Sequence, residues 1–82
     1  MIKYKAYYVC NNRSLTVSKA LEYTNLAKAV KDMRACTRGN HIATPHNQSY
    51  FIITDMNGKE LQHGVLCGIN KRFRYEREFC LE

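Results

Sequence analysis

The sequence of 82 residues has no long run of apolar side chains. Its first eight residues, MIKYKAYY, lack the continuous apolar stretch of a secretory signal. No window approaches the length of a membrane-spanning helix, which needs about 20 apolar residues. These absences lead us to expect a cytoplasmic protein that has no membrane partner.

Closely spaced cysteines are absent as well. No two form a Cys-x-x-Cys pair, so we expect reduced thiols that act mostly as small apolar groups: Cys10, Cys36, Cys67 and Cys80. A zinc site that combines them with His41, His46 and His63 is a minor alternative, because the spacing is not that of a zinc motif. We expect neither a metal nor a cofactor.

Acidic residues are missing from two long stretches, residues 1–21 and 33–54. Overall, 13 lysines and arginines stand against seven aspartates and glutamates, which gives a formal net charge of +6. A basic surface attracts phosphate mainly by releasing condensed counterions, and this needs no sequence motif. The charge pattern favours a nucleic-acid partner; the alternative is a basic surface that only keeps the protein soluble.

Repeats, low-complexity segments and linkers are also lacking, so we expect residues 1–82 to form a single domain with a modest core. Every second residue from 2 to 10 is apolar or aromatic, which predicts the first strand of a hairpin within residues 1–20. A two-residue turn at Asn11-Asn12 would pair Tyr8 with Leu15 and Ala6 with Val17.

One helix is expected, at residues 25–37. Thr24 can cap its first turn, and Gly39 can end it in the left-handed conformation. An apolar stripe at helical spacing is expected to face the core: Leu26, Ala29, Val30, Met33 and Cys36.

Two strands are expected after the helix, at residues 49–54 and 60–66. A three-residue loop with Gly58 left-handed would pair Asp55 with Lys59 and Ile53 with Leu61. Residues 72–79 alternate as an edge strand would, with a short helix as the alternative.

The order of these elements predicts an α+β fold: an antiparallel sheet of four or five strands with one helix packed on one face. The uncovered face would be exposed to solvent or covered by a binding partner. It would carry Lys3, Lys5, Tyr7, Thr16 and Ser18.

Cations interleaved with aromatic residues can combine phosphate contact with base stacking. Two strand-like segments show this pattern and are candidate nucleic-acid-binding residues: Lys3, Lys5 and Tyr7, and then Lys71, Arg72, Arg74 and Tyr75. A third candidate group follows the exposed side of the helix, diluted only by Asp32: Lys28, Lys31, Arg34 and Arg38. No RNP motif, Gly-x-x-Gly clamp or zinc knuckle is present, so shape and charge would dominate binding.

Paired carboxylates, phosphate-cradling loops and nucleophile motifs are absent, and we expect a protein that is not an enzyme. The strongest signal for catalysis is a resemblance to the HicA family of small mRNA-cleaving toxins. It rests on His41 after Gly39-Asn40, and on Gly58-Lys59-Glu60-Leu61, Gly64, Leu66 and Ile69. The resemblance implies that His41 is the catalytic residue of a ribonuclease. Asn40 stands where that family has Ser, and the N-terminal hairpin has no counterpart in the family.

As a whole the chain is similar to the accessory proteins of large tailed bacteriophages, in its shortness, its richness in Lys, Asn and Tyr, and its lack of metabolic motifs. Such proteins disarm host defences, including CRISPR complexes and toxin–antitoxin systems. The resulting hypothesis is a homodimeric RNA-binding protein, encoded by a phage, that blocks a host RNA or ribonucleoprotein in the host cytoplasm. The alternative is an anti-CRISPR-like, protein-directed inhibitor that docks on an acidic host surface.

Overall fold

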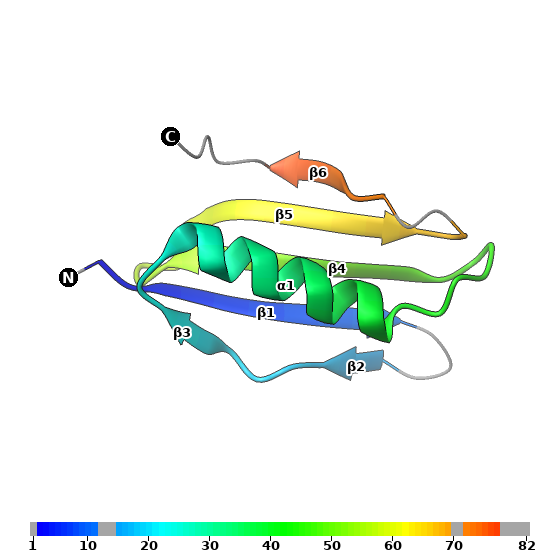
Figure 1. Ribbon diagram of the computed structural model, residues 1–82, viewed down its shortest axis with the longest axis horizontal. Coiled ribbons are helices and arrows are strands. Elements are labelled where there is room, and N and C mark those ends of the chain that lie inside the picture. The colour runs from blue at the N-terminus through cyan, green and yellow to red at the C-terminus, as the bar shows by residue number, and fades with distance from the viewer. Residues whose placement is uncertain (1, 12–14, 70–71, 78–82) are drawn as a thin grey trace.

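The computed structural model of the protein describes residues 2–11, 15–69 and 72–77. One helix lies on one face of an antiparallel sheet, so the predicted α+β fold is confirmed (Figure 1). The elements, in chain order, are β1 (Tyr4–Asn11), β2 (Leu15–Val17), β3 (Leu21–Tyr23), α1 (Leu26–Asn40), β4 (Gln48–Asp55), β5 (Glu60–Cys67) and β6 (Arg74–Arg77). The strands run β2-β1-β4-β5-β6 across the sheet, and β3 pairs with β1 beside β2.

The outer strand next to β1 is broken into two pieces, β2 and β3. Val17 pairs with Val9 and Leu21 pairs with Ala6, so three residues of the edge lie opposite two residues of β1. Ser18 fills this bulge, because its Oγ accepts from the amide of Tyr8 at 2.9 Å and its own amide donates to the carbonyl of Tyr8. Ser18 therefore does not join Lys5 and Tyr7 on the uncovered face.

The register predicted for the first hairpin is wrong, and β3 was not predicted. Asn11 belongs to β1 and pairs with Leu15 instead of forming a two-residue turn. Asn12, the second residue of the predicted turn, lies outside the described residues. Alternation along β1 was interpreted correctly, since Ala6 and Cys10 are buried. The length of the turn was not, and in a hairpin the turn helps to set the register.

The helix begins and ends later than predicted. Its N-cap is Asn25, not Thr24, because the Asn25 Oδ1 accepts from the amide of Lys28 at 3.1 Å. Gly39 lies inside the helix and does not have a positive φ. In the last turn, the side chain of Asn40 donates a hydrogen bond from Nδ2 to the carbonyl of Cys36. Thr37, rather than Cys36, is fully buried, since its hydroxyl bonds to the Met33 carbonyl at 2.6 Å.

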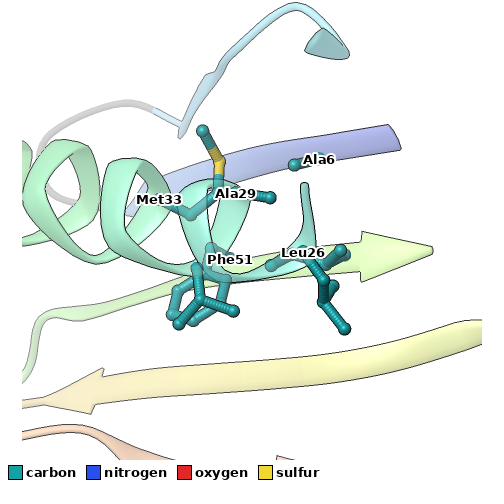
Figure 2. Packing of buried hydrophobic residues seen from close by; sticks show 7 residues of the cluster. Ala6, Leu26, Ala29, Met33 and Phe51 are labelled. Carbon is teal, nitrogen blue, oxygen red and sulfur yellow. The ribbon is translucent and has the colours of Figure 1, made fainter. Parts of the chain in front are cut away.

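The core lies between α1 and the two central strands. Figure 2 shows Leu26, Ala29 and Met33 of α1 over Ala6 of β1 and Phe51 of β4. Half-buried aromatic side chains pack around this cluster: Tyr4, Tyr8, Tyr23, Phe73 and Tyr75. Four of the five helix residues predicted for the core are buried, which confirms the helical stripe except at Cys36.

The turn between β4 and β5 combines one correct and one wrong prediction. Gly58 is left-handed at φ +85°, and the Asp55 amide donates to the Lys59 carbonyl at 3.0 Å, as expected. A bulge after Ile53 then shifts the register, so Ile53 pairs with Gln62 and not with Leu61. The additional residue is Leu61 of β5. The sequence pattern did not indicate a bulge there, because an apolar residue at this position is typical of the core.

Residues 74–77 form the edge strand β6 and pair with β5, so the strand interpretation of this segment is confirmed there. Residues 78 and 79, also predicted as strand, lie outside the described residues. Within the described part of the chain, α1 has neither the length nor the apolar composition of a membrane-spanning helix.

Gly64 of β5 lies directly against two aromatic rings. A Cβ built there would lie 2.7 Å from Phe51 Cζ and 3.1 Å from Phe73 Cδ1. We predict that Gly64→Ala lowers the free energy of unfolding by about 1–3 kcal/mol, because the two rings must shift. Thermal or urea unfolding measures this.

Gly39→Ala is the matched control, since a Cβ there meets no atom within 4 Å and the site is helical. It should stabilise the protein by about 0.5–1 kcal/mol. Equal effects of the two substitutions would show that the packing around Gly64 does not constrain the fold.

Candidate nucleic-acid interface

The predicted cations lie on opposite faces of the sheet. Lys5, Tyr7 and Arg74 occupy the face away from α1, which we call the open face. Lys3 is exposed just before β1, and Lys28, Lys31, Arg34 and Arg38 are exposed on α1, on the other side of the sheet. No single track joins these cations, and Lys71 lies outside the described residues.

Cations on the open face are mixed with acids. Lys5 is the direct cross-strand partner of Glu22, and Glu60 lies in the same row two strands away. Glu60 also contacts Nδ1 of His63 at 3.3 Å. Burial, and after it the charges of Tyr50 and Glu60, raise the pKa of the Tyr7 hydroxyl above its ordinary value.

An apolar row crosses the middle of the open face. It runs over four strands as Val17, Val9, Tyr50 and Val65, and it ends at Arg74 of β6. Val17 is 57% exposed, while Val9 and Val65 are buried. The exposed apolar surface of the row is therefore mainly Val17 at the sheet edge and the half-buried Tyr50.

On the covered side, two arginines of α1 lie next to one aromatic ring. Arg34 and Arg38 both lie over Phe73, with their Cζ atoms 5.8 Å and 5.3 Å from the ring centroid. Lys31 lies one turn before them. We call Lys31, Arg34 and Arg38 the basic flank of α1.

The single acidic residue of α1 points away from the basic flank. Asp32 accepts a hydrogen bond from the hydroxyl of Tyr23 on β3 at 3.1 Å. Burial, and after it the hydrogen bond and charge of Asp32, raise the pKa of Tyr23 above its ordinary value. Lys28 lies one turn before Asp32, close enough for their charges to offset each other, and is therefore not part of the flank.

A shallow hollow of about 410 Å³ runs along the basic flank. The short side chains of the alanines leave space between the longer basic side chains. The residues that line the hollow are Ala27, Val30, Lys31, Arg34, Ala35 and Arg38. Sequence reasoning did not find this feature, because alanines at 27 and 35 carry no chemical signal of their own.

Phe73 was also missed, although it alternates with arginines in the sequence. Its ring packs edge-on against Phe51 at 5.3 Å and stacks on Tyr75 at 6.1 Å. Arg74 and Tyr75 were predicted to act together, but they are successive residues of a strand and point to opposite faces. Arg72 is exposed just before β6.

His41, implied as catalytic by the resemblance to HicA, is a buried structural link. Its Nε2 is 2.7 Å from the Gly68 carbonyl and its Nδ1 is 2.8 Å from Ser49 Oγ. A carbonyl only accepts, so Nε2 donates, and in the neutral ring Nδ1 then accepts from the Ser49 hydroxyl. Both nitrogens are occupied, and neither is placed to take a proton from a substrate.

Among the residues that the structure describes, no three His, Cys, Asp or Glu side chains gather as metal ligands. Comparisons of the chain with protein-family models, with curated proteins and with solved structures gave no match.

We predict that His41→Ala lowers the free energy of unfolding by about 2–4 kcal/mol, because it removes a buried ring and its hydrogen bonds to the Ser49 hydroxyl and the Gly68 carbonyl. The exposed His46→Ala should change it by less than about 0.5 kcal/mol. Unfolding curves of both variants, with an RNA-cleavage assay alongside, test this. A stable His41 variant that had lost RNA cleavage would instead make His41 catalytic.

Proposed function

We propose that the protein binds RNA through the basic flank of α1 and does not cleave it. The observation that supports this is the gathering of Arg34 and Arg38 over one ring, with Lys31 beside them. The acidic residue of α1, Asp32, is held on the other side by its hydrogen bond to Tyr23. A guanidinium offers planar, bidentate hydrogen bonds that suit phosphate.

The expected affinity of one such surface is modest. Three phosphate contacts release about two to three counterions, so the affinity should fall by about that power of the salt concentration. Sequence-independent binding of this kind typically has a Kd of about 10⁻⁴ to 10⁻⁶ M at physiological salt. A function at low concentration would need two flanks acting together, which a dimer supplies.

In biological terms, we propose that a phage-encoded protein of this kind occludes a host RNA or ribonucleoprotein of a defence or toxin–antitoxin system in the cytoplasm. The charge pattern and the exposed cations support this proposal; the host RNA is identified by purifying the protein from cells and sequencing the RNA that accompanies it.

We predict that the double variant Arg34→Glu with Arg38→Glu weakens RNA binding by about 100-fold at low salt, since it removes two phosphate contacts and adds two repulsive charges. Fluorescence anisotropy with a labelled RNA measures it. The matched control is Lys3→Glu with Lys5→Glu, which changes the net charge equally but acts away from α1, at Lys5 of the open face and at Lys3 just before β1. The RNA affinity of the control should fall by less than about tenfold. An equal fall in both variants would mean that RNA binding depends on the overall charge and not on the basic flank.

The exposed members of the apolar row, Val17 and the half-buried Tyr50, support a second candidate, a protein partner bound on the open face. A second copy of the chain is the simplest such partner, because the core is small and the sheet edges are exposed. Tyr50→Lys, in the middle of the row, should then convert a dimer into a monomer in sedimentation. If the wild-type protein sediments with the mass of one chain at every concentration, it does not form a dimer. A protein-directed inhibitor would instead retain a host protein after nuclease treatment.

A further inference from the structure

We propose that the sugar–phosphate chain of RNA lies lengthwise in the hollow along α1, and that Lys31 and Arg34, in the middle of that hollow, determine how tightly it binds. Given the RNA binding proposed above, on which this inference rests, the basic flank contacts the backbone of the nucleic acid and not its bases. The two cations lower the stability of the free protein, and a bound phosphate chain restores it.

The first observation is the shape of the hollow. Its lining residues all belong to α1, and the first and last of them, Ala27 and Arg38, are 11 positions apart. This separation is about 16 Å along a helix axis, a distance over which one stacked strand places about four or five phosphates. A long, shallow hollow of this kind accommodates a chain that runs along the helix better than it accommodates a compact molecule.

The second observation is the chemistry of the lining. Its side chains are either short and apolar, as at Ala27, Ala35 and the buried Val30, or they are lysine and arginine. Lysine and arginine donate hydrogen bonds and accept none. Phosphate oxygens accept hydrogen bonds and therefore match this lining, whereas the edges of bases present donors as well as acceptors. The uncharged floor leaves room for the sugars between the phosphates.

The third observation is that no acidic residue of α1 offsets the charges of Lys31 and Arg34. On a helix, side chains three or four positions apart are neighbours. The neighbours of these two cations within α1 are alanine, valine, threonine or another cation. Asp32, the acidic residue of the helix, bonds to Tyr23 on the other side.

The arrangement of like charges is a cost to the free protein. Lys28, Lys31 and Arg34 follow one another at intervals of three positions, and like-charge neighbours destabilise a helix. A surface that only kept the protein soluble would be more stable with both signs of charge interspersed. A phosphate chain along the hollow reduces this repulsion, so RNA binding should also stabilise the folded protein.

Arg38 contributes in a different way from the two central cations. It lies at one end of the hollow and has a further interaction within the protein. Its charge adds to the field at that end, while the middle of the hollow depends on Lys31 and Arg34. Their charges attract a phosphate whichever way the side chains turn, so no particular orientation of Arg34 over Phe73 is required.

The first experiment fills the hollow and leaves every charge in place. Ala27→Leu and Ala35→Leu add bulk at exposed positions of α1, and leucine is a good helix former, so both variants should fold. The matched control is Gly39→Leu. It adds the same side chain at a helical position that does not line the hollow, where a Cβ meets no atom within 4 Å.

Fluorescence anisotropy with a labelled oligouridylate of about 12 nucleotides measures the affinity. Each filled variant should bind about five- to 20-fold more weakly than the wild type, and the control should differ by less than about twofold. Oligoadenylate of the same length should bind the wild type within about threefold of oligouridylate, because the bases are not contacted. A larger preference for one base would contradict a backbone contact.

The second experiment separates binding from stability. Lys31→Glu places an acidic residue beside Lys28 and Arg34, so two repulsive contacts become attractive. The melting temperature of the free protein should rise by about 2–6 °C, while the RNA affinity falls at least about tenfold. The control for net charge is Lys19→Glu, at an exposed position between β2 and β3, which should change the affinity by less than about threefold.

Opposite changes in stability and affinity are the mark of a residue that acts in binding. If Lys31→Glu lowers both the melting temperature and the affinity, Lys31 acts through the fold and its proposed role is wrong. If Lys19→Glu loses as much affinity as Lys31→Glu, the net charge binds RNA and the hollow does not.

Polyglutamate with the same number of charges as the RNA is the competitor that tests the kind of chain. It should displace the oligonucleotide at least about tenfold less well, because its charge density is lower. Equal displacement would make the occupant of the hollow an acidic protein chain and would overturn the proposal.

The last two outcomes separate this inference from the proposed function. Wild-type protein that binds no RNA overturns both together. RNA affinity that is lost in Arg34→Glu with Arg38→Glu, but unchanged in both filled variants, leaves the proposed function standing and shows that RNA does not lie in the hollow.

Discussion

The contact between Phe51, Gly64 and Phe73 is the constraint on which the rest of the structure depends. Phe51 is the largest fully buried side chain, and it lies under α1 as well as against β5. Because Gly64 has no side chain, Phe73 can reach Phe51 from the far side of β5. The same three residues therefore close the core and bring an aromatic ring to the basic flank of α1.

Local patterns were sufficient to predict the fold class. Alternation identified β1, and helical spacing identified the buried side of α1. Wherever a boundary depended on one hydrogen bond, prediction failed: Asn25 displaced Thr24 as the cap, and Thr37 entered the core by bonding to the Met33 carbonyl. Each bulge, at Ser18 and after Ile53, changed a register that alternation alone cannot determine.

The candidate site was only partly predictable, for a related reason. Sequence shows which residues are charged, but the layers of the fold decide which of them share a face. One helix on one side of the sheet separates the cations of α1 from Lys5 and Arg74 (Figure 1). Alternation within β6 separates Arg74 from Tyr75, and Phe73 meets the arginines of α1 through contacts that span more than 30 positions in the chain.

The broken edge formed by β2 and β3 has a consequence for how the sheet meets other chains. A long, regular edge strand exposes a row of amides and carbonyls on which a foreign strand can assemble, and this is a route to fibrils. Here the Ser18 hydroxyl interrupts the ladder, and each remaining piece has only three residues. Strand addition on this side is thereby restricted to short segments, which protects a small, tyrosine-rich protein from aggregation.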